Sequence, residues 1–170
     1  MRNDIKEIER LFKVLEGLLT DPRDRVYVLA SSYNLNQDVL GSAYMSWNRY
    51  KEVSRRILPT SNVDKRDGFP QPLLTAQYVI IGSPQQYAVG EKDQRVVGVP
   101  AELILTRQGI GTSFERLPYK FVIEDNVKVY IYKKVRPLSD ADLNDLSERL
   151  RKYYPERKNI YEIKKSELVQ

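Results

Sequence analysis

Residues 25–38 read RVYVLASSYNLNQD, and the chain changes from apolar to polar halfway along them. The run 26–30 is rich in β-branched and aromatic side chains, which predicts a strand buried on both faces. Polar residues follow, and a helical spacing of apolar side chains begins at about Asp38. We expect Asn36 or Asn34 to cap that helix. A buried strand, a polar turn and a helix in succession indicate an α/β protein.

The polar exit of this strand is a candidate binding site. Open α/β sheets bind ligands at the carboxyl ends of their strands, and Ser31, Ser32, Asn34 and Asn36 offer hydrogen-bonding groups there. The stretch contains neither G-x-G-x-x-G nor G-x-x-x-x-G-K-[ST], so it lacks the glycines that let a backbone approach a pyrophosphate. Two interpretations stay open: a small-molecule site, or a loop that only caps the next helix.

Helices and strands alternate on both sides of this stretch. Apolar side chains with a helical period predict a helix over 3–19, and the proline in the following TDPRD ends it. A second buried strand is predicted over 77–81, followed by Gly-Ser-Pro. The segment 51–61 fits either a strand or the end of a helix.

A further helix is expected over 91–109. Pro100 should break or kink it, because proline lacks the backbone donor that a helix interior needs. Gly109 and Gly111 would then close it, since glycine adopts the left-handed backbone that commonly ends a helix.

The stretch YKFVIEDNVKVYIYKKV, residues 119–135, predicts an antiparallel hairpin. Asp125 and Asn126 tolerate the left-handed backbone of a tight turn. Apolar residues of one parity give the hairpin one buried face: Phe121, Ile123, Val127, Val129 and Ile131.

The last predicted helix begins at Ser139, which forms a capping-box pattern with Asp142 three residues later. One apolar face runs along it, formed by Leu143, Leu146, Leu150 and Tyr153. The predicted fold class is therefore α/β: a layered sheet with alternating helices and an antiparallel hairpin at one edge.

The length of 170 residues predicts one domain over 1–170. Within it we expect a lead-in helix over 1–20 and a frayed basic tail over 155–170. No apolar run approaches the roughly 18 residues that span a bilayer, and no signal peptide opens the sequence. We therefore expect the isolated chain to be soluble.

The chain contains no cysteine and no histidine. Thiol catalysis, disulfides, cysteine-based metal sites and the Ser-His-Asp triad are excluded. Without a histidine base, Ser31 and Ser32 are poor nucleophiles. We predict no catalytic residue, no cofactor and no metal ligand.

A second candidate loop, NVDKRDGFPQ, contains Asp64, Arg66 and Asp67. Two carboxylates close in sequence can bind a hard metal ion or share acid–base work. Because Lys65 and Arg66 lie between them, a salt-bridged loop is the simpler interpretation.

A third candidate loop follows the strand predicted over 77–81. Its side chains Gln85, Gln86 and Tyr87 suit stacking on, and hydrogen bonding to, a sugar. The composition of an ordinary surface loop explains them equally well.

Several phrases, in their order, resemble a known family. They are DRVYVLASSYNLNQDVL, SNVDKRDGFP, AQYVIIGSPQQY, DQRVVGVPAELIL and GIGTSFERLPYKFVIEDNVKVYIYKKVRPLS. They look like the C-terminal soluble segment of the C-type, dolichyl-phosphate-mannose-transferase-like membrane glycosyltransferases, which use polyprenyl-phosphate sugars. The resemblance covers about residues 2–151.

The resemblance implies an extracytoplasmic α/β domain at the face of the cell membrane. The family's catalytic acids lie between transmembrane helices that this chain lacks, so no catalytic residue is carried over. The implied partner is the transmembrane portion of the parent enzyme, with a carbohydrate acceptor as a further ligand. The three polar loops would then lie on one side of the sheet.

Two alternatives from other classes stay open. The first is an intracellular α/β binding module whose basic C-terminus, RLRKYYPERKNIYEIKK, contacts nucleic acid, although we do not expect nucleic acid as the partner. The second is a histidine-free enzyme that acts through Asp64 or Asp67.

Overall fold

The fold comes from a computed structural model, which describes residues 3–45, 47–60 and 63–162. A mixed sheet of four strands lies at its centre, in the order β1-β2-β4-β3. β1 pairs with β2 in parallel, and the other two pairings are antiparallel. The strands are β1 (Val26–Val28), β2 (Tyr78–Ser83), β3 (Phe114–Ile123) and β4 (Val127–Lys134). The predicted α/β sheet with a hairpin at one edge is confirmed.

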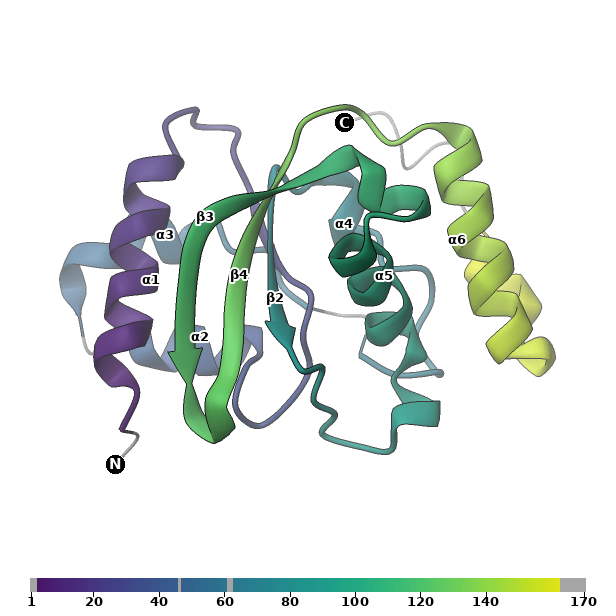
Figure 1. Cartoon of the computed structure of the whole chain (residues 1–170), viewed down its shortest axis with the longest axis horizontal. Coiled ribbons are helices and arrows are strands. Elements are labelled where there is room, and N and C mark those ends of the chain that lie inside the picture. Colours follow the sequence, from purple (N-terminus) through teal and green to yellow (C-terminus); the bar gives the residue numbers. More distant parts are fainter. Residues whose placement is uncertain (1–2, 46, 61–62, 163–170) are drawn as a thin grey trace.

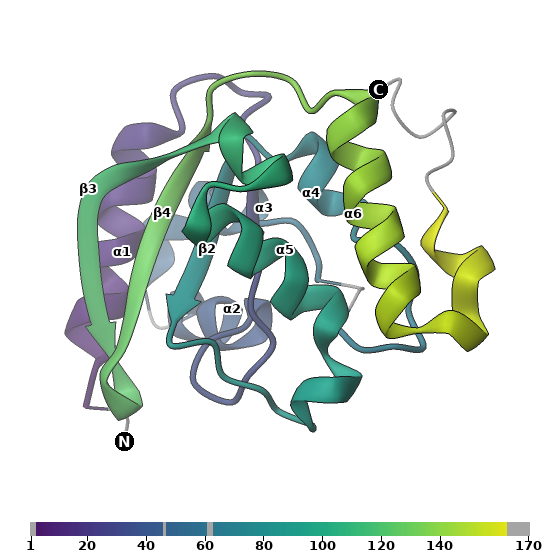
Figure 2. The ribbon, with the colours of Figure 1, turned by 45° about the vertical axis from the view of Figure 1, so that its right-hand side comes forward.

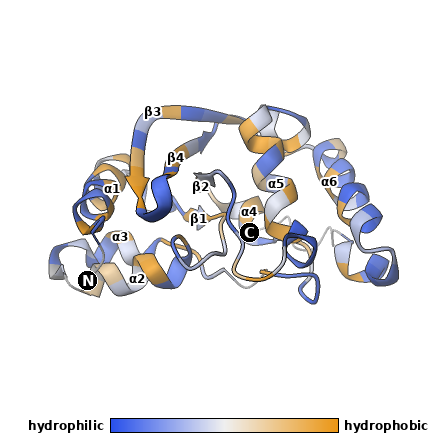
Figure 3. Ribbon diagram, turned by 60° about the horizontal axis from the view of Figure 1, so that its bottom comes forward, coloured by the Kyte–Doolittle hydropathy of each residue, from blue (hydrophilic) through white to orange (hydrophobic). Residues whose placement is uncertain are grey.

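Helices cover both faces of this sheet (Figure 1). One layer contains α1 (Ile5–Leu18), α2 (Gln37–Met45) and α3 (Lys51–Arg55), and the other contains α4 (Pro72–Thr75), α5 (Arg95–Thr106) and α6 (Asp140–Tyr153). Figure 3, which looks at the molecule from one end, shows α1 and α2 on one side of the strands and α5 and α6 on the other. Short 3-10 segments complete the described structure: η1 (Asn48–Tyr50), η2 (Glu91–Asp93), η3 (Gly109–Ser113), η4 (Glu124–Asn126) and η5 (Pro155–Tyr161).

Alternate strand residues supply two separate cores. Val26 and Ile80 pack towards α1, while their chain neighbours Tyr27 and Val79 pack towards α5. Because successive side chains of a strand point to opposite faces, a strand covered on both sides is apolar throughout. All three residues of β1 are buried, which confirms the strand predicted at the start of the quoted stretch.

The predicted turn and cap signals are confirmed. Asp125 and Asn126 both have φ of 57°, and every residue of the predicted apolar hairpin face is buried. Ser139 and Asp142 form the capping box of α6. Asn36, rather than Asn34, caps α2, because its Oδ1 accepts a hydrogen bond of 2.7 Å from the Val39 N–H.

The structure resolves the open predictions near the helix ends. The segment 51–61 matches the helix-end alternative: it begins as α3, and its Ile57 then bridges to Val26. Helix α5 continues through Pro100, because its largely buried apolar residues hold it between the sheet and α6. Arg107 takes the left-handed backbone directly after α5, with φ of 56°, and the predicted Gly109 takes it two residues later, with φ of 48°.

The C-terminal part of the chain is also packed differently from the prediction. Tyr153 is 52% exposed, and its neighbour Tyr154 is buried in its place. Tyr161 is buried, stacks on Tyr154 with ring centroids 5.5 Å apart, and donates a hydrogen bond to the Lys65 carbonyl. Residues 155–161 therefore form the ordered segment η5, attached to the second core through Tyr161, and not a frayed tail, while 163–170 lie outside the described residues.

The outer edge of β3 is bonded to side chains of α1, which lies beside it in Figure 1. Arg10 donates a hydrogen bond of 2.6 Å to the Lys120 carbonyl, and the Val122 N–H donates one of 3.2 Å to the Glu7 carboxylate.

Among the described residues, no helix has the length and apolar character needed to cross a membrane.

Candidate functional site

Three polar loops gather at the carboxyl ends of the parallel strands β1 and β2. The loop 31–36 follows β1, the loop 84–90 follows β2, and the loop 63–67 precedes α4. Because β1 and β2 run in the same direction, their exit loops must meet at the same end of the sheet. The predicted placement of the three loops on one side agrees with the contacts between them.

Gln94 joins the three loops. Its Nε2 donates hydrogen bonds to the carbonyls of Ser31 (3.0 Å) and Val63 (3.2 Å), and its Oε1 accepts one from the Val89 N–H (3.0 Å). The Gln94 side chain is only 1% exposed, so these bonds are shielded from water. Gln94 was not among the predicted site residues, because a glutamine in a polar stretch carries no sequence signal.

The loops after β1 and β2 also contact each other directly. Ser31 and Tyr87 form a parallel bridge. The Asn34 Nδ2 donates to the Gln86 Oε1 at 2.9 Å and to the Asp125 Oδ2 at 2.6 Å. Asn34 thus ties the first two candidate loops to the turn of the β3–β4 hairpin.

Two of the predicted residues have a local structural role. The Ser32 hydroxyl is buried and bonds both the N–H and the carbonyl of Leu35. Asn36 caps α2 with its Oδ1 and donates from its Nδ2 to the Ser32 carbonyl. These contacts match the interpretation of the loop as a cap for the next helix.

The aspartates of the loop 63–67 are bonded within it. Arg66 holds Asp64 through a 2.5 Å ion pair, and this hydrogen bond is the main cause that lowers the pKa of Asp64. The Asp67 Oδ2 accepts hydrogen bonds from the N–H groups of Val63 and Asp64. The contacts agree with a salt-bridged loop. Within the described ranges, no group of three or more acidic side chains is placed to hold a metal ion.

The loop after β2 turns its tyrosine inwards. A Cβ atom added at Gly98 would lie 3.0 Å from the Tyr87 hydroxyl oxygen, so the tyrosine lies against α5. Burial raises the pKa of Tyr87. Gln85 is half-buried, and its Oε1 has no hydrogen-bond partner in the described part of the chain. A buried amide oxygen without a partner costs free energy that a ligand donor or a water would recover.

The exposed part of this three-loop surface combines an aromatic ring with amides. Tyr33 is 79% exposed and Val89 is 50% exposed, and the same two loops carry the half-buried amides of Asn34 and Gln86. An exposed ring beside planar hydrogen-bonding groups suits a polyhydroxylated ligand better than an ion. Tyr33 was not among the predicted site residues, since tyrosines are common throughout the chain.

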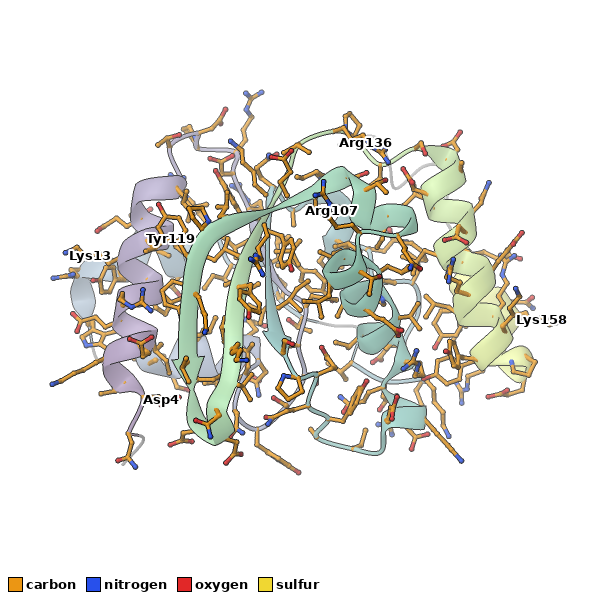
Figure 4. All side chains as sticks on the ribbon, viewed as in Figure 1. Asp4, Lys13, Arg107, Tyr119, Arg136 and Lys158 are labelled. Carbon is orange, nitrogen blue, oxygen red and sulfur yellow. The ribbon has the colours of Figure 1, made fainter. Side chains whose placement is uncertain are left out.

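The beginning of the described chain lies at the same end of the molecule. The Asp4 Oδ2 accepts a hydrogen bond of 2.9 Å from the Glu124 N–H, in the turn that also bonds Asn34. Figure 4 shows Asp4 beside the tip of the hairpin.

Searches against protein-family models, curated proteins and solved structures find no match for this chain.

Proposed function

We propose that this chain is the extramembrane, non-catalytic domain of a membrane glycosyltransferase that uses a polyprenyl-phosphate sugar. In this role the three-loop surface binds the carbohydrate acceptor or orders the loops of the membrane active site. One observation carries the proposal: the three-loop surface and the beginning of the described chain lie at the same end of the molecule. A membrane segment that led into residue 3 would lie at the end where Tyr33, Asn34 and Gln86 are presented.

The chemistry of the surface supports a binding role. The carboxylates of the loop 63–67 are engaged by Arg66 and by backbone N–H groups, so they are poorly placed as a general acid and base. The exposed phenol ring of Tyr33 and the half-buried amides can hydrogen-bond hydroxyl groups without transferring protons. The phrases resembling the glycosyltransferase family extend over the strands and loops that build this surface.

The upstream gene sequence tests the membrane part of the proposal. We expect several hydrophobic segments of about 20 residues each ahead of this stretch, in the same reading frame. A reading frame without such segments would contradict the assignment to a membrane enzyme.

The acceptor role is tested in the full-length protein with Tyr33→Ala, because this side chain is exposed and its removal should leave folding intact. We expect a higher KM for the acceptor if the surface binds it, and a lower kcat if the surface orders the membrane loops. Arg23→Ala is the control, since Arg23 is exposed and lies in the loop before β1, at the opposite end of the sheet. Unchanged transfer by Tyr33→Ala would rule out a role for this surface.

A further inference from the structure

Three arginines differ from the others in the described part of the chain. Arginines such as Arg66 and Arg149 bond to carboxylates, and Arg25 and Arg56 bond to backbone carbonyls. The guanidinium groups of three make no hydrogen bond and no ion pair within that part: Arg107, Arg116 and Arg157. A guanidinium carries five N–H donors and a permanent charge, so an unpaired arginine is ready to bind an anion.

Two of these three arginines line one cavity. It has a volume of about 410 Å³ and lies between the end of α5 and the beginning of β3. Figure 2 shows α5 in front of β2 and the β3–β4 ribbon beside it, and Figure 4 shows Arg107 next to the start of β3. The lining residues are Leu105, Arg107, Phe114, Glu115, Arg116 and Tyr132.

The hydroxyl of a tyrosine in the same cavity makes no hydrogen bond to the described chain. Tyr132 is 4% exposed, and its hydroxyl makes no hydrogen bond to any described residue. Burial raises the pKa of Tyr132, so the hydroxyl keeps its proton and can act as a donor. The hydroxyl oxygen itself keeps contact with solvent, so a ligand can reach it. A bound oxygen atom would accept a hydrogen bond from this hydroxyl.

The neighbouring contacts leave the donors of Arg116 available. Its guanidinium lies over the Tyr130 ring, 5.1 Å from the centroid. A ring beside one face of the guanidinium leaves the N–H groups at its edge free to bond. A register shift in β3 directly follows Arg116, and such bulges commonly re-aim a side chain.

The acidic residue of the cavity faces away from this arginine. Successive side chains of a strand alternate, so Glu115 lies on the face of β3 opposite to Arg116, where Lys133 is its cross-strand neighbour. On the face of Arg116, the other charged residues of β3 and β4 are all cationic: Lys120, Lys128 and Lys134. The charge on this face of β3 and β4 is therefore positive, and Glu115 is the one acidic residue among those that line the cavity.

We propose that this cavity binds the phosphate group of a small phosphomonoester. Two unpaired guanidinium charges match a phosphate dianion, and their planar donor arrays fit its oxygens in a bidentate manner. The Tyr132 hydroxyl supplies a further donor. The cavity also has apolar walls, from Leu105 and Phe114, that suit the organic part of the molecule. The proposal does not rest on the proposed function, because this cavity lies at the opposite end of the sheet from the three-loop surface.

Calorimetric titration at low ionic strength tests the site, with inorganic phosphate and then glucose 6-phosphate as the probes. Each substitution Arg107→Gly and Arg116→Gln should weaken phosphate binding by roughly tenfold or more, since each removes a charge-assisted hydrogen bond. Tyr132→Phe should weaken it by roughly two- to tenfold through the loss of one neutral donor. Arg157→Gln, which removes an equally unpaired charge elsewhere, is the matched control and should bind as the unmodified chain does.

Arg107→Gly also separates binding from folding. Residue 107 has φ of 56° and ψ of 42°, a conformation that glycine adopts without the strain of a Cβ atom. This variant should therefore melt at the same or a higher temperature while it loses phosphate binding. If phosphate does not bind to the unmodified chain, or if Arg157→Gln weakens binding as much as Arg116→Gln, the proposal is overturned.

Two further arms identify the source of the phosphate. Vesicles that contain phosphatidic acid are compared with vesicles of phosphatidylcholine alone, in the presence and absence of free phosphate. Binding to phosphatidic acid that Arg116→Gln abolishes and free phosphate displaces would support the site with a lipid headgroup as its ligand. Binding of glucose 6-phosphate without vesicle binding would support it with a soluble ligand.

Discussion

The Gln94 side chain donates a hydrogen bond of 3.0 Å to the carbonyl of Ser31, a residue 63 positions away. The same side chain bonds Val63 and Val89, so one buried amide fixes the relative positions of three loops. A buried amide bonded in this way contributes little net free energy, because folding exchanges its hydrogen bonds to water for hydrogen bonds to the protein. Removing the amide costs much more, because its former partners stay buried without a hydrogen bond.

Replacing Gln94 by leucine keeps the volume and removes these bonds. We expect Gln94→Leu to lower the free energy of unfolding by about 2–4 kcal/mol, since the Val63 carbonyl and the Val89 N–H lose their partner. Denaturant unfolding measures this, and the Val89 amide should exchange faster with solvent. Gln108→Leu, at an exposed position, should change stability by less than about 0.5 kcal/mol. Equal effects of the two substitutions would contradict the role of Gln94.

Gly111 lies against the backbone of the last turns of α5. A Cβ atom there would be 2.0 Å from the Leu103 carbonyl oxygen, which neither backbone can avoid without moving. We expect Gly111→Ala to destabilise the protein by about 3 kcal/mol or more. Gly41 in α2 has no atom within 4 Å of its added Cβ, so Gly41→Ala should stabilise by about 0.5–1 kcal/mol. Thermal melting of the two variants measures this difference, and similar melting temperatures for Gly111→Ala and Gly41→Ala would refute the prediction.

The Asp64–Arg66 pair makes stability depend on pH in the acidic range. Because Arg66 lowers the pKa of Asp64 in the folded chain, the pair stabilises the fold above the unfolded pKa of about 3.9. That stabilisation is lost as the pH falls from this value through the lower pKa of the folded state. The free energy of unfolding, measured between pH 5 and about pH 2, should therefore fall less steeply in Asp64→Asn. Arg66→Gln should flatten the same part of the curve; an unchanged slope in both variants would exclude the linkage.

The hairpin turn places a non-glycine residue in the left-handed region. Asn126 is exposed, has φ of 57° and makes no side-chain hydrogen bond to the rest of the described chain. A β-branched residue tolerates this conformation poorly, so Asn126→Val should lower stability by about 1–2 kcal/mol. Asn126→Gly removes the same side chain without that strain and should melt no lower than the unmodified chain. Equal melting of the valine and glycine variants would argue against backbone strain as the cause.

Much of the fold could be predicted because its signals are local. The alternation of Phe121, Ile123 and Val127 defines a buried face without knowledge of the partner strand. Ser139 and Asp142 cap a helix through bonds within four residues. The buried strands could be recognised because a strand covered on both faces has no polar positions.

The errors occurred where packing overrides local preference. Pro100 remains inside α5 because burial of that helix offsets the lost hydrogen bond and strain. In α6, a spacing of three or four residues after Leu150 fits a helical face equally well, and packing against Tyr161 selects Tyr154 over Tyr153.

The two candidate sites differed in how far the sequence could locate them. The direction of parallel strands predicts that the loops after β1 and β2 meet, but the role of Gln94 depends on the packed loops. The phosphate cavity had no recognisable motif, because Arg107, Arg116 and Tyr132 lie on three elements. Only the register of β3 against β4 shows that Arg116 and Tyr132 are cross-strand neighbours.

The side chains of α1 that bond the outer edge of β3 have a consequence for self-association. A sheet edge with free N–H and carbonyl groups can accept a strand from another chain, and this addition is the first step of fibre growth. Arg10 and Glu7 occupy the groups of Lys120 and Val122 that such a strand would need. The first helix therefore protects the hairpin from fibrillar aggregation, and shifting it away from β3 would expose a surface prone to polymerise.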